Sequence, residues 1–211
     1  MALECERKYL GIDFASVRTA LKEHHAVCEG IHIESNSLWD TPHRRLRPQG
    51  TLLRLRTQQW YASGNNCAAC KGRTYILTLK MVATEQQGCK IREECEVVVD
   101  DVAIMESILR GLGYEITARY EKVREVWHMH NAELALDILP FGHFMEVEGT
   151  VEAIEYVAKL VHIERALQST ESYHRLHQEW RSAQGLEPCI DFVFEPAQKA
   201  ELVRYIQELS L

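Results

Sequence analysis

The chain has 211 residues, of which 46% are hydrophobic, and a formal net charge of −7. This length suits one domain or one domain with an appendage, and the apolar share suffices for a core. The negative net charge argues against a protein that coats nucleic acid or binds anionic membranes. The sequence has no stretch of about 18 apolar residues, the length that a membrane-spanning helix needs. Since the N-terminus shows no secretory signal, the seven cysteines indicate free thiols in a reducing cytoplasm.

Alternation of apolar and polar residues predicts eight strands joined mostly by short turns. They are expected at residues 4–8, 31–39, 51–57, 75–81, 90–98, 116–129, 134–139 and 144–148. Helices are expected at residues 14–28, 102–112, 151–162, 168–183 and 196–209. Asp13 would cap the first helix and Gly30 would stop it.

The simplest arrangement of these elements is an α+β fold, mainly antiparallel β. Closing eight up-and-down strands into a barrel would remove the exposed sheet edges, with helices packed outside and a C-terminal helical tail. We place the barrel domain at residues 1–180 and a helical extension, packed on the same domain, at 181–211. The tail could cover one barrel end or form a dimer contact, and we favour the cover. A monomer and a homodimer both remain open.

The turn between the third and fourth strands contains Cys67 and Cys70 in a C-x-x-C spacing. A structural zinc site needs about four ligands, and no second pair has ligand spacing. A redox motif would require a helix after the pair, whereas a strand is predicted there. The pattern therefore favours free cysteines, and their role stays open.

One face of nearly every predicted strand is charged. The residues concerned are Glu4, Glu6, Lys8, Arg54, Arg56, Lys80, Lys90, Arg92, Glu94, Glu96, Lys122, Arg124, Asp137, Glu146 and Glu148. A half-buried strand shows its polar face to water, so one such face proves nothing. Here, however, the acids cluster on the first and last strands and the cations on the middle ones. The opposite faces are apolar and need helices to cover them, which would turn the charged faces inward.

An eight-stranded barrel has an interior wide enough for side chains or one small ligand. About fifteen charged groups would be too costly to enclose there without a highly charged ligand and a metal ion. Arginines and lysines would hold a polyanion, and the carboxylates would hold a divalent cation on its other side. The residues alone thus predict a polyphosphate ligand with Mg²⁺ or Mn²⁺.

At these residues the sequence resembles the CYTH superfamily, or triphosphate tunnel metalloenzymes, which includes class IV adenylyl cyclases, thiamine triphosphatases and inorganic triphosphatases. The resemblance runs from about residue 3 to 175, and its strength lies in the order of the motifs. These are Glu4-x-Glu6-x-Lys8, Asp40-Thr41-Pro42, Leu46-Arg47, Gly50, Leu53-Arg54-Leu55-Arg56, Thr78-x-Lys80, Arg92-x-Glu94-x-Glu96, Lys122-x-Arg124, Asp137 and Glu146-Val147-Glu148-Gly149.

The resemblance implies a triphosphate bound inside the barrel with a divalent metal. Metal ligands would be Glu4, Glu6, Asp137, Glu146 and Glu148. Phosphate contacts would come from Lys8, Arg54, Arg56, Lys80, Arg92, Lys122 and Arg124. Glu94 and Glu96 would orient those cations. Lys8, beside Glu4 and Glu6, could act as an acid or base or as a plain phosphate contact.

Two departures from the family pattern bear on the reaction. Many members have an aromatic pair, with a tyrosine sometimes paired to the motif lysine, where this chain has Leu38 and Trp39, so a tyrosine–lysine pair is not expected here. The His-Phe segment of the better-known cyclases is absent before Glu4, which favours hydrolysis of a triphosphate, whereas Glu171-Ser172-Tyr173 resembles the cyclase-like branch. Three functions remain open: a triphosphatase, a class IV-type adenylyl cyclase, and a non-catalytic triphosphate binder. The sequence does not show which organic group, if any, the small-molecule triphosphate carries, and it does not distinguish Mg²⁺ from Mn²⁺.

Overall fold

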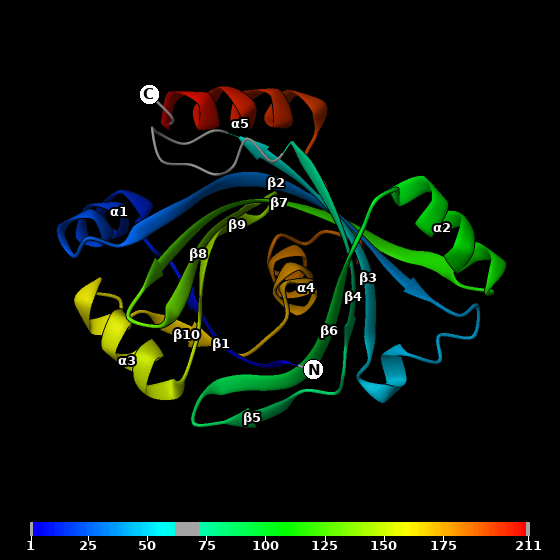
Figure 1. Cartoon of the computed structure of the whole chain (residues 1–211), viewed down its shortest axis with the longest axis horizontal. Helices are drawn as coiled ribbons and strands as arrows, with labels where there is room; N and C mark the ends of the chain where they lie inside the picture. The colour runs from blue at the N-terminus through cyan, green and yellow to red at the C-terminus, as the bar shows by residue number, and fades with distance from the viewer. Residues whose placement is uncertain (1, 62–71, 210–211) are drawn as a thin grey trace.

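The computed structural model describes residues 2–61 and 72–209, with side chains from residue 5 onward. Its main feature is a closed barrel of eight antiparallel strands (Figure 1), which confirms the predicted fold class. The barrel strands are β1 (Ala2–Leu10), β2 (Val27–Asp40), β3 (Leu52–Tyr61), β4 (Arg73–Lys80), β6 (Cys89–Val99), β7 (Glu115–Met129), β8 (Ala132–Leu139) and β9 (Gly142–Glu148). Two short strands that the sequence did not indicate, β5 (Thr84–Gln86) and β10 (Leu167–Ser169), extend the sheet on β6 and β1.

The first strand closes the barrel. Glu6 of β1 lies opposite Glu148 of β9 on one side and opposite Lys90 of β6 on the other. Both edges of β1 are thereby paired, so the described strands of the barrel form one continuous ladder. Closure also converts the alternation along each strand into an inner and an outer face.

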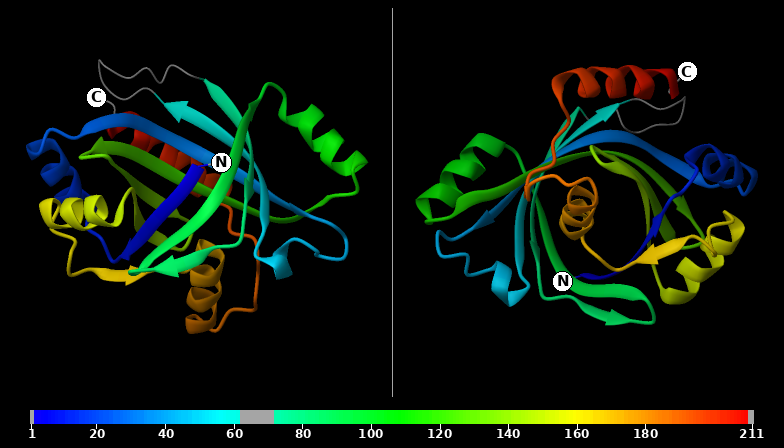
Figure 2. Two further views of the ribbon diagram at one scale, coloured as in Figure 1. Left: turned by 60° about the horizontal axis from the view of Figure 1, so that its bottom comes forward. Right: turned by 180° about the vertical axis from the view of Figure 1, so that it is seen from behind.

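Helices cover the apolar outer face, as Figure 2 shows from two further sides. They are α1 (Phe14–Glu23), α2 (Val102–Gly111), α3 (Val151–Leu160) and α5 (Pro196–Leu209), whereas α4 (Tyr173–Ala183) lies elsewhere. Met145 and Val147 of β9 form one core with the residues of α1 and α3. Leu109 of α2 packs against Trp39 and Leu55.

The two C-terminal helices have different places. An aromatic cluster that includes Tyr120, Phe144, Tyr173 and Phe192 fixes α4 over one end of the barrel. In Figure 1 this helix is seen through the barrel, and the side view in Figure 2 shows it below the strands. By contrast, α5 packs on the outer wall, where Ile206 meets Ile31 and Val123. The predicted domain division at residue 180 falls within α4 and stays a prediction.

The first helix is shorter than the sequence suggested. It ends at Glu23, because His25 takes a left-handed conformation and the Ala26 amide donates to the Leu21 carbonyl at 2.9 Å. This is a Schellman-type cap with histidine where glycine is common. The expected stop at Gly30 is wrong: Gly30 lies inside β2, at a bulge opposite Val126.

The predicted helix over residues 168–183 begins only at Tyr173. Leu167–Ser169 pairs with β1 instead, and the Ser172 side chain accepts the Arg175 amide at 3.3 Å as the helix cap.

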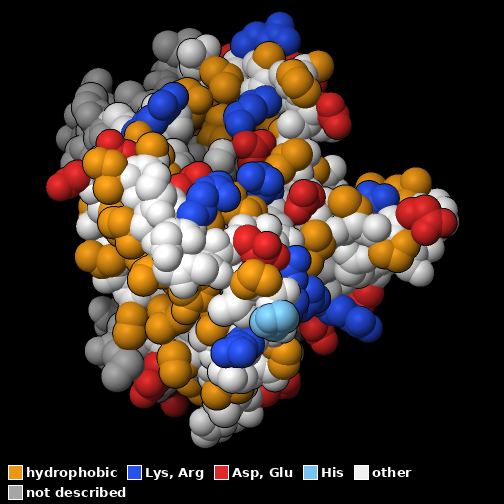
Figure 3. Space-filling model, turned by 90° about the vertical axis from the view of Figure 1, so that its right-hand side faces the viewer, with side chains coloured by type: hydrophobic (Ala, Val, Ile, Leu, Met, Phe, Trp, Pro, Cys, Tyr) orange, Lys and Arg blue, Asp and Glu red, His pale blue; other side chains and the backbone are white. Residues whose placement is uncertain are grey.

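Cys67 and Cys70 lie outside the described residues. Of the helices described, none is long and apolar enough to cross a membrane. On the outer face drawn in Figure 3, Lys and Arg side chains lie among Asp and Glu side chains.

We expect Ile206→Ala to lower the free energy of unfolding by about 3 kcal/mol, because it empties a fully buried position between α5 and the barrel wall. Urea denaturation measures this loss. The control is Leu209→Ala on the same helix, which is 39% exposed and should change stability by less than about 1 kcal/mol. Equal effects of the two changes would contradict the packing of α5 described above.

Candidate active site

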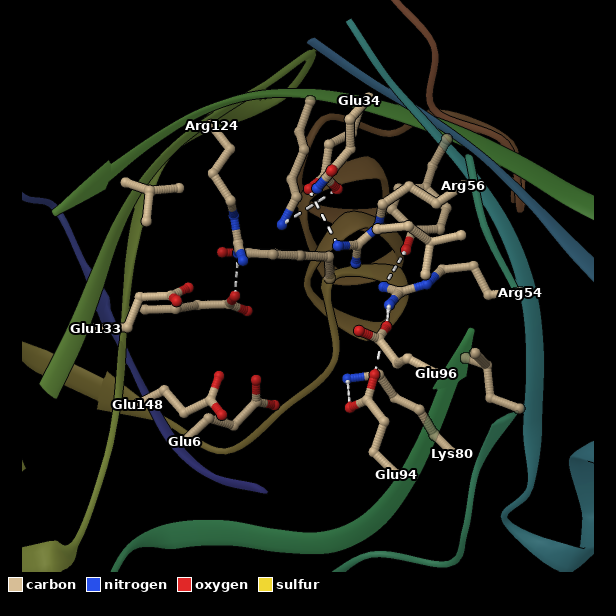
Figure 4. A pocket seen from close by; sticks show the side chains of 18 of the residues that line it. Glu6, Glu34, Arg54, Arg56, Lys80, Glu94, Glu96, Arg124, Glu133 and Glu148 are labelled. Atoms are coloured by element: carbon tan, nitrogen blue, oxygen red, sulfur yellow. Dashed lines mark hydrogen bonds and ion pairs between the residues drawn. The ribbon is translucent and has the colours of Figure 1, made fainter. Parts of the chain in front are cut away.

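The inner faces of the barrel strands enclose a cavity of about 910 Å³ (Figure 4). Eight basic side chains line it: Lys8, Arg54, Arg56, Lys80, Lys90, Arg92, Lys122 and Arg124. Eight carboxylates line it as well: Glu6, Glu29, Glu34, Glu94, Glu96, Glu133, Glu146 and Glu148. The charged strand faces therefore point inward, and the charges that line the cavity balance.

Asp137 sits behind this lining, with no exposed surface. Its carboxylate accepts hydrogen bonds from Lys122 at 3.1 Å, from Arg124 at 2.7 and 2.6 Å, and from the Tyr173 hydroxyl at 2.8 Å. Arg124 also pairs with Glu146. Asp137 thus orients two cations in this structure, and its predicted role as a metal ligand stays a prediction.

Glu34 is a second fully buried carboxylate, which sequence reasoning missed. Its oxygens lie 3.3 Å from Arg56, 3.7 Å from Lys122 and 3.0 Å from His32 Nε2. Burial by itself raises the pKa of Glu34, but the charges of Arg56 and Lys122 outweigh it, so this pKa falls well below its usual range. The available signal was the alternation of His32, Glu34 and Asn36, which shares the inward parity.

Lys8 is held between two carboxylates. Its Nζ lies 3.0 Å from Glu6 and 2.9 Å from Glu146, and 5.2 Å from the centre of the Tyr173 ring. Burial lowers the pKa of Lys8, yet the charges of Glu146 and Glu6 more than compensate and raise it overall. The ammonium is therefore protonated here, which favours a phosphate contact over a base among the two predicted roles.

The opposite wall carries Arg54 and Lys80 with their counter-charges. Arg54 lies 3.3 Å from Glu96 and 3.7 Å from Glu94, and Lys80 lies 2.6 Å from Glu94. Thr78 links the group, since it donates to Glu96 at 2.6 Å. Glu94 and Glu96 therefore lie beside the cations that they are expected to orient.

Three glutamates stand in a row at the open end of the cavity. Glu6 of β1 lies opposite Glu148 of β9, and Glu148 lies opposite Glu133 of β8. Figure 4 shows the three side chains pointing into the pocket from the side that faces Arg54 and Lys80. Glu133 escaped sequence reasoning because the strand was predicted to begin at residue 134, whereas β8 begins at Ala132. Within residues 2–61 and 72–209, no three His, Cys, Asp or Glu side chains form a ready-made metal site.

Every residue predicted to contact phosphate lines this one cavity: Lys8, Arg54, Arg56, Lys80, Arg92, Lys122 and Arg124. Of the predicted metal ligands, Glu6, Glu146 and Glu148 line it too. Glu4 lies in β1 opposite Arg92, but its side chain is outside the described part of the chain. Which of these residues bind phosphate or metal stays a prediction.

Asp40 of the Asp-Thr-Pro motif lies outside the cavity and stabilises the loop that follows β2. Its carboxylate accepts the backbone amides of Thr41, Leu46 and Arg47 at 2.7–3.1 Å. These bonds satisfy donors that the turn would otherwise leave unpaired. The motif therefore shapes the loop between β2 and β3.

The chain belongs to the CYTH family, whose domain model matches residues 2–176. A proposed adenylate cyclase from Vibrio parahaemolyticus is 22% identical, with a TM-score of 0.68, and the match covers 83% of this chain and 97% of that one. The PH1819 protein from Pyrococcus horikoshii is 24% identical, with a TM-score of 0.64 and 83% and 98% coverage.

A more distant structure is a proposed adenylyl cyclase from Hippeastrum, described as having a dominant triphosphatase activity. It is 16% identical, with a TM-score of 0.56, and the match covers 90% of this chain and 99% of that one. At these identities the likeness extends to the fold. No curated protein matches the chain.

We expect Glu34→Gln to lower the free energy of unfolding by about 3 kcal/mol, because Arg56 and Lys122 would lose a buried counter-charge. Urea denaturation without ligand measures the loss. Glu115→Gln is the control: its pair with Arg44 is exposed, at 3.5 Å, and should contribute less than about 1 kcal/mol. A Glu34→Gln variant as stable as the natural chain would show that Glu34 is not needed as a counter-charge.

His174 predicts a pH effect on stability. Burial, reinforced by the charge of Arg47, lowers the pKa of His174 from 6.5 to about 4. The unfolded chain therefore takes up a proton at this residue before the folded chain does, and stability falls as the pH drops from about 6.5 to 4. Denaturation at several pH values should give a flatter profile for His174→Asn. Parallel profiles for the two proteins would contradict this assignment.

Proposed function

We propose that this protein is a divalent-metal-dependent triphosphatase that binds its substrate inside the barrel. The observation that carries this proposal is the set of basic side chains that converge on one cavity. Seven of them pair with a carboxylate: Lys8, Arg54, Arg56, Lys80, Lys90, Lys122 and Arg124. Arginine and lysine suit phosphate oxygens, and arginine can bind them in bidentate fashion. The triphosphate would be inorganic, or carry thiamine or a nucleoside at one end.

The charge balance of the cavity supports the proposed need for a divalent metal. Eight basic and eight acidic side chains leave no surplus positive charge for a polyanion. A buried charge without compensation costs several kcal/mol. Triphosphate therefore has to enter together with divalent cations, which restore neutrality.

The carboxylates at the open end fit such a cation. Mg²⁺ and Mn²⁺ prefer oxygen ligands, and Mg²⁺ commonly takes one or two carboxylates together with substrate phosphates and water. Glu6 and Glu148 lie opposite each other on adjacent strands and face the cavity, and Glu4 precedes Glu6 by two residues in β1. A site of this kind needs no cage of three protein ligands. When bound, the ion supplies charge neutralisation at the phosphoryl group.

The remaining residues bind and orient the substrate. Phosphoryl transfer depends mainly on positioning and charge stabilisation, so fixed cations are the chief requirement. Arg56, Lys122 and Arg124 are held in place by Glu34 and Asp137 and need not reorganise when phosphate arrives. Lys8 would contact phosphate as an ammonium.

We favour hydrolysis over cyclisation because hydrolysis needs only the charged lining, whereas a cyclase would also have to hold a nucleoside against apolar residues such as Leu52, Trp60 and Ile76. Purified protein should be given inorganic triphosphate, thiamine triphosphate and ATP, each with Mg²⁺ or Mn²⁺. Orthophosphate from any of them supports the proposal, and a chelator should abolish it. Cyclic AMP with pyrophosphate from ATP would instead establish a class IV-type cyclase. Binding without any product would establish a non-catalytic triphosphate binder.

We expect Glu148→Gln to reduce turnover by about 100-fold or more, because it removes a charge that the metal requires. Triphosphate binding should persist, since the cations remain. Initial rates and calorimetric binding give the two quantities. Glu201→Gln on the exposed side of α5 is the control, with unchanged turnover. Full activity of Glu148→Gln would exclude Glu148 from the metal site.

A further inference from the structure

Tyr173 is the first residue of α4 and brings that helix into the cavity. Its side chain is buried and lines the closed end of the barrel. The sequence singled out Glu171-Ser172-Tyr173 only as a family-like stretch, and the proposed mechanism assigns it no task. Its position between a covering helix and the phosphate-facing cations raises the question of what it does there.

The contacts of Tyr173 all lead to the cation cluster. Its hydroxyl donates to Asp137 Oδ2 at 2.8 Å, the same oxygen that accepts from Lys122 at 3.1 Å and from Arg124 at 2.6 Å. The face of its ring lies 5.2 Å from the Lys8 Nζ and 5.5 Å from the Lys122 Nζ. One side chain thus binds Asp137, a predicted metal ligand, and faces two lysines predicted to contact phosphate.

Aromatic packing holds Tyr173 from behind. Its ring centre lies 5.3 Å from that of Phe144, and Phe192 belongs to the same buried cluster. Phe192 is itself anchored, because its amide donates to the Arg119 carbonyl at 3.1 Å and its carbonyl accepts the Glu121 amide at 2.9 Å. The tyrosine is therefore fixed to β7, the strand that carries Lys122 and Arg124.

A phenol is suited to this place because it donates a hydrogen bond without adding charge. Burial and the charge of Asp137 raise the pKa of Tyr173 far above 10, so the hydroxyl keeps its proton. Without that donor, Asp137 would keep its two bonds to Arg124 and its bond to Lys122, but its Oδ2 would lose one of three donors. The direction in which Asp137 holds Lys122 and Arg124 toward the cavity would then be less well fixed.

We propose that Tyr173 is a positioning residue, through which α4 fixes Asp137 and thereby aims Lys122 and Arg124 at the substrate. This inference rests on the proposed binding of triphosphate in the cavity. The inference means that α4 contributes to ligand binding in addition to covering one end of the barrel. It also explains why a buried tyrosine, and not a phenylalanine, stands at this helix start.

The test is a double-mutant cycle on the binding of imidotriphosphate, a nonhydrolysable analogue of inorganic triphosphate, with Mg²⁺. Tyr173→Phe keeps the ring and should raise Kd about 10-fold, the loss expected for a hydrogen bond to a charged group. In the Asp137→Asn background the same change should raise Kd less than about 2-fold, because the two residues act as one unit. Should Asp137→Asn fail to fold, Lys122→Gln replaces it in the cycle.

Tyr9→Phe is the matched control, because it removes a buried hydroxyl from the outer side of β1. It should leave Kd unchanged. A Tyr173→Phe protein with lower thermal stability but unchanged Kd, or with equal losses in both backgrounds, would overturn the proposal. The proposed hydrolysis is judged separately: natural protein that binds the analogue but cleaves no triphosphate contradicts hydrolysis alone and still allows the cycle to be measured.

Discussion

Charge compensation inside a closed barrel is the constraint on which the rest of this structure depends. A cation enclosed in the interior is tolerated only with a carboxylate beside it, and the two fully buried acids, Glu34 and Asp137, supply this for Arg56, Lys122 and Arg124. The same pairing holds the cations in fixed directions before any ligand arrives. Fixed cations are what the proposed phosphoryl transfer would need, so one network would serve both the stability of the barrel and the proposed function.

The network also explains the division of labour among the helices. Because the inner face is mostly charged, most apolar residues of the strands lie outside, and α1, α2, α3 and α5 are needed to cover them. Only α4 belongs to the interior. It covers one barrel end with an aromatic cluster and presents Tyr173 to Asp137. With that end covered, the carboxylates of Glu6, Glu133 and Glu148 lie at the opposite, open end.

The sequence predicted most of the charged residues that line the cavity, because strand alternation marks which residues share a face. Arg54 and Arg56, or Glu146 and Glu148, could be assigned to one inner face from spacing alone. Glu34, Glu133 and Tyr173 could not. Glu34 sits in a strand of mixed polarity, Glu133 precedes the predicted start of its strand, and Tyr173 comes from a helix whose docking depends on residues far away in the chain. The roles of these three residues follow from contacts with residues distant in the chain, and the alternation along a strand does not reveal such contacts.

By itself, the sequence determined the eight barrel strands, the inward direction of the charged faces and the set of candidate residues for the proposed phosphate and metal contacts. These follow from local alternation and from the need to cover apolar faces. Only the tertiary structure decided which charges pair. The register at the closing strand places Glu6 opposite Glu148. The register between β7 and β8 places Asp137 opposite Arg124 and within reach of Lys122. Pairing depends on strand register and helix docking, which are set by packing over the whole barrel and not by any one stretch of sequence.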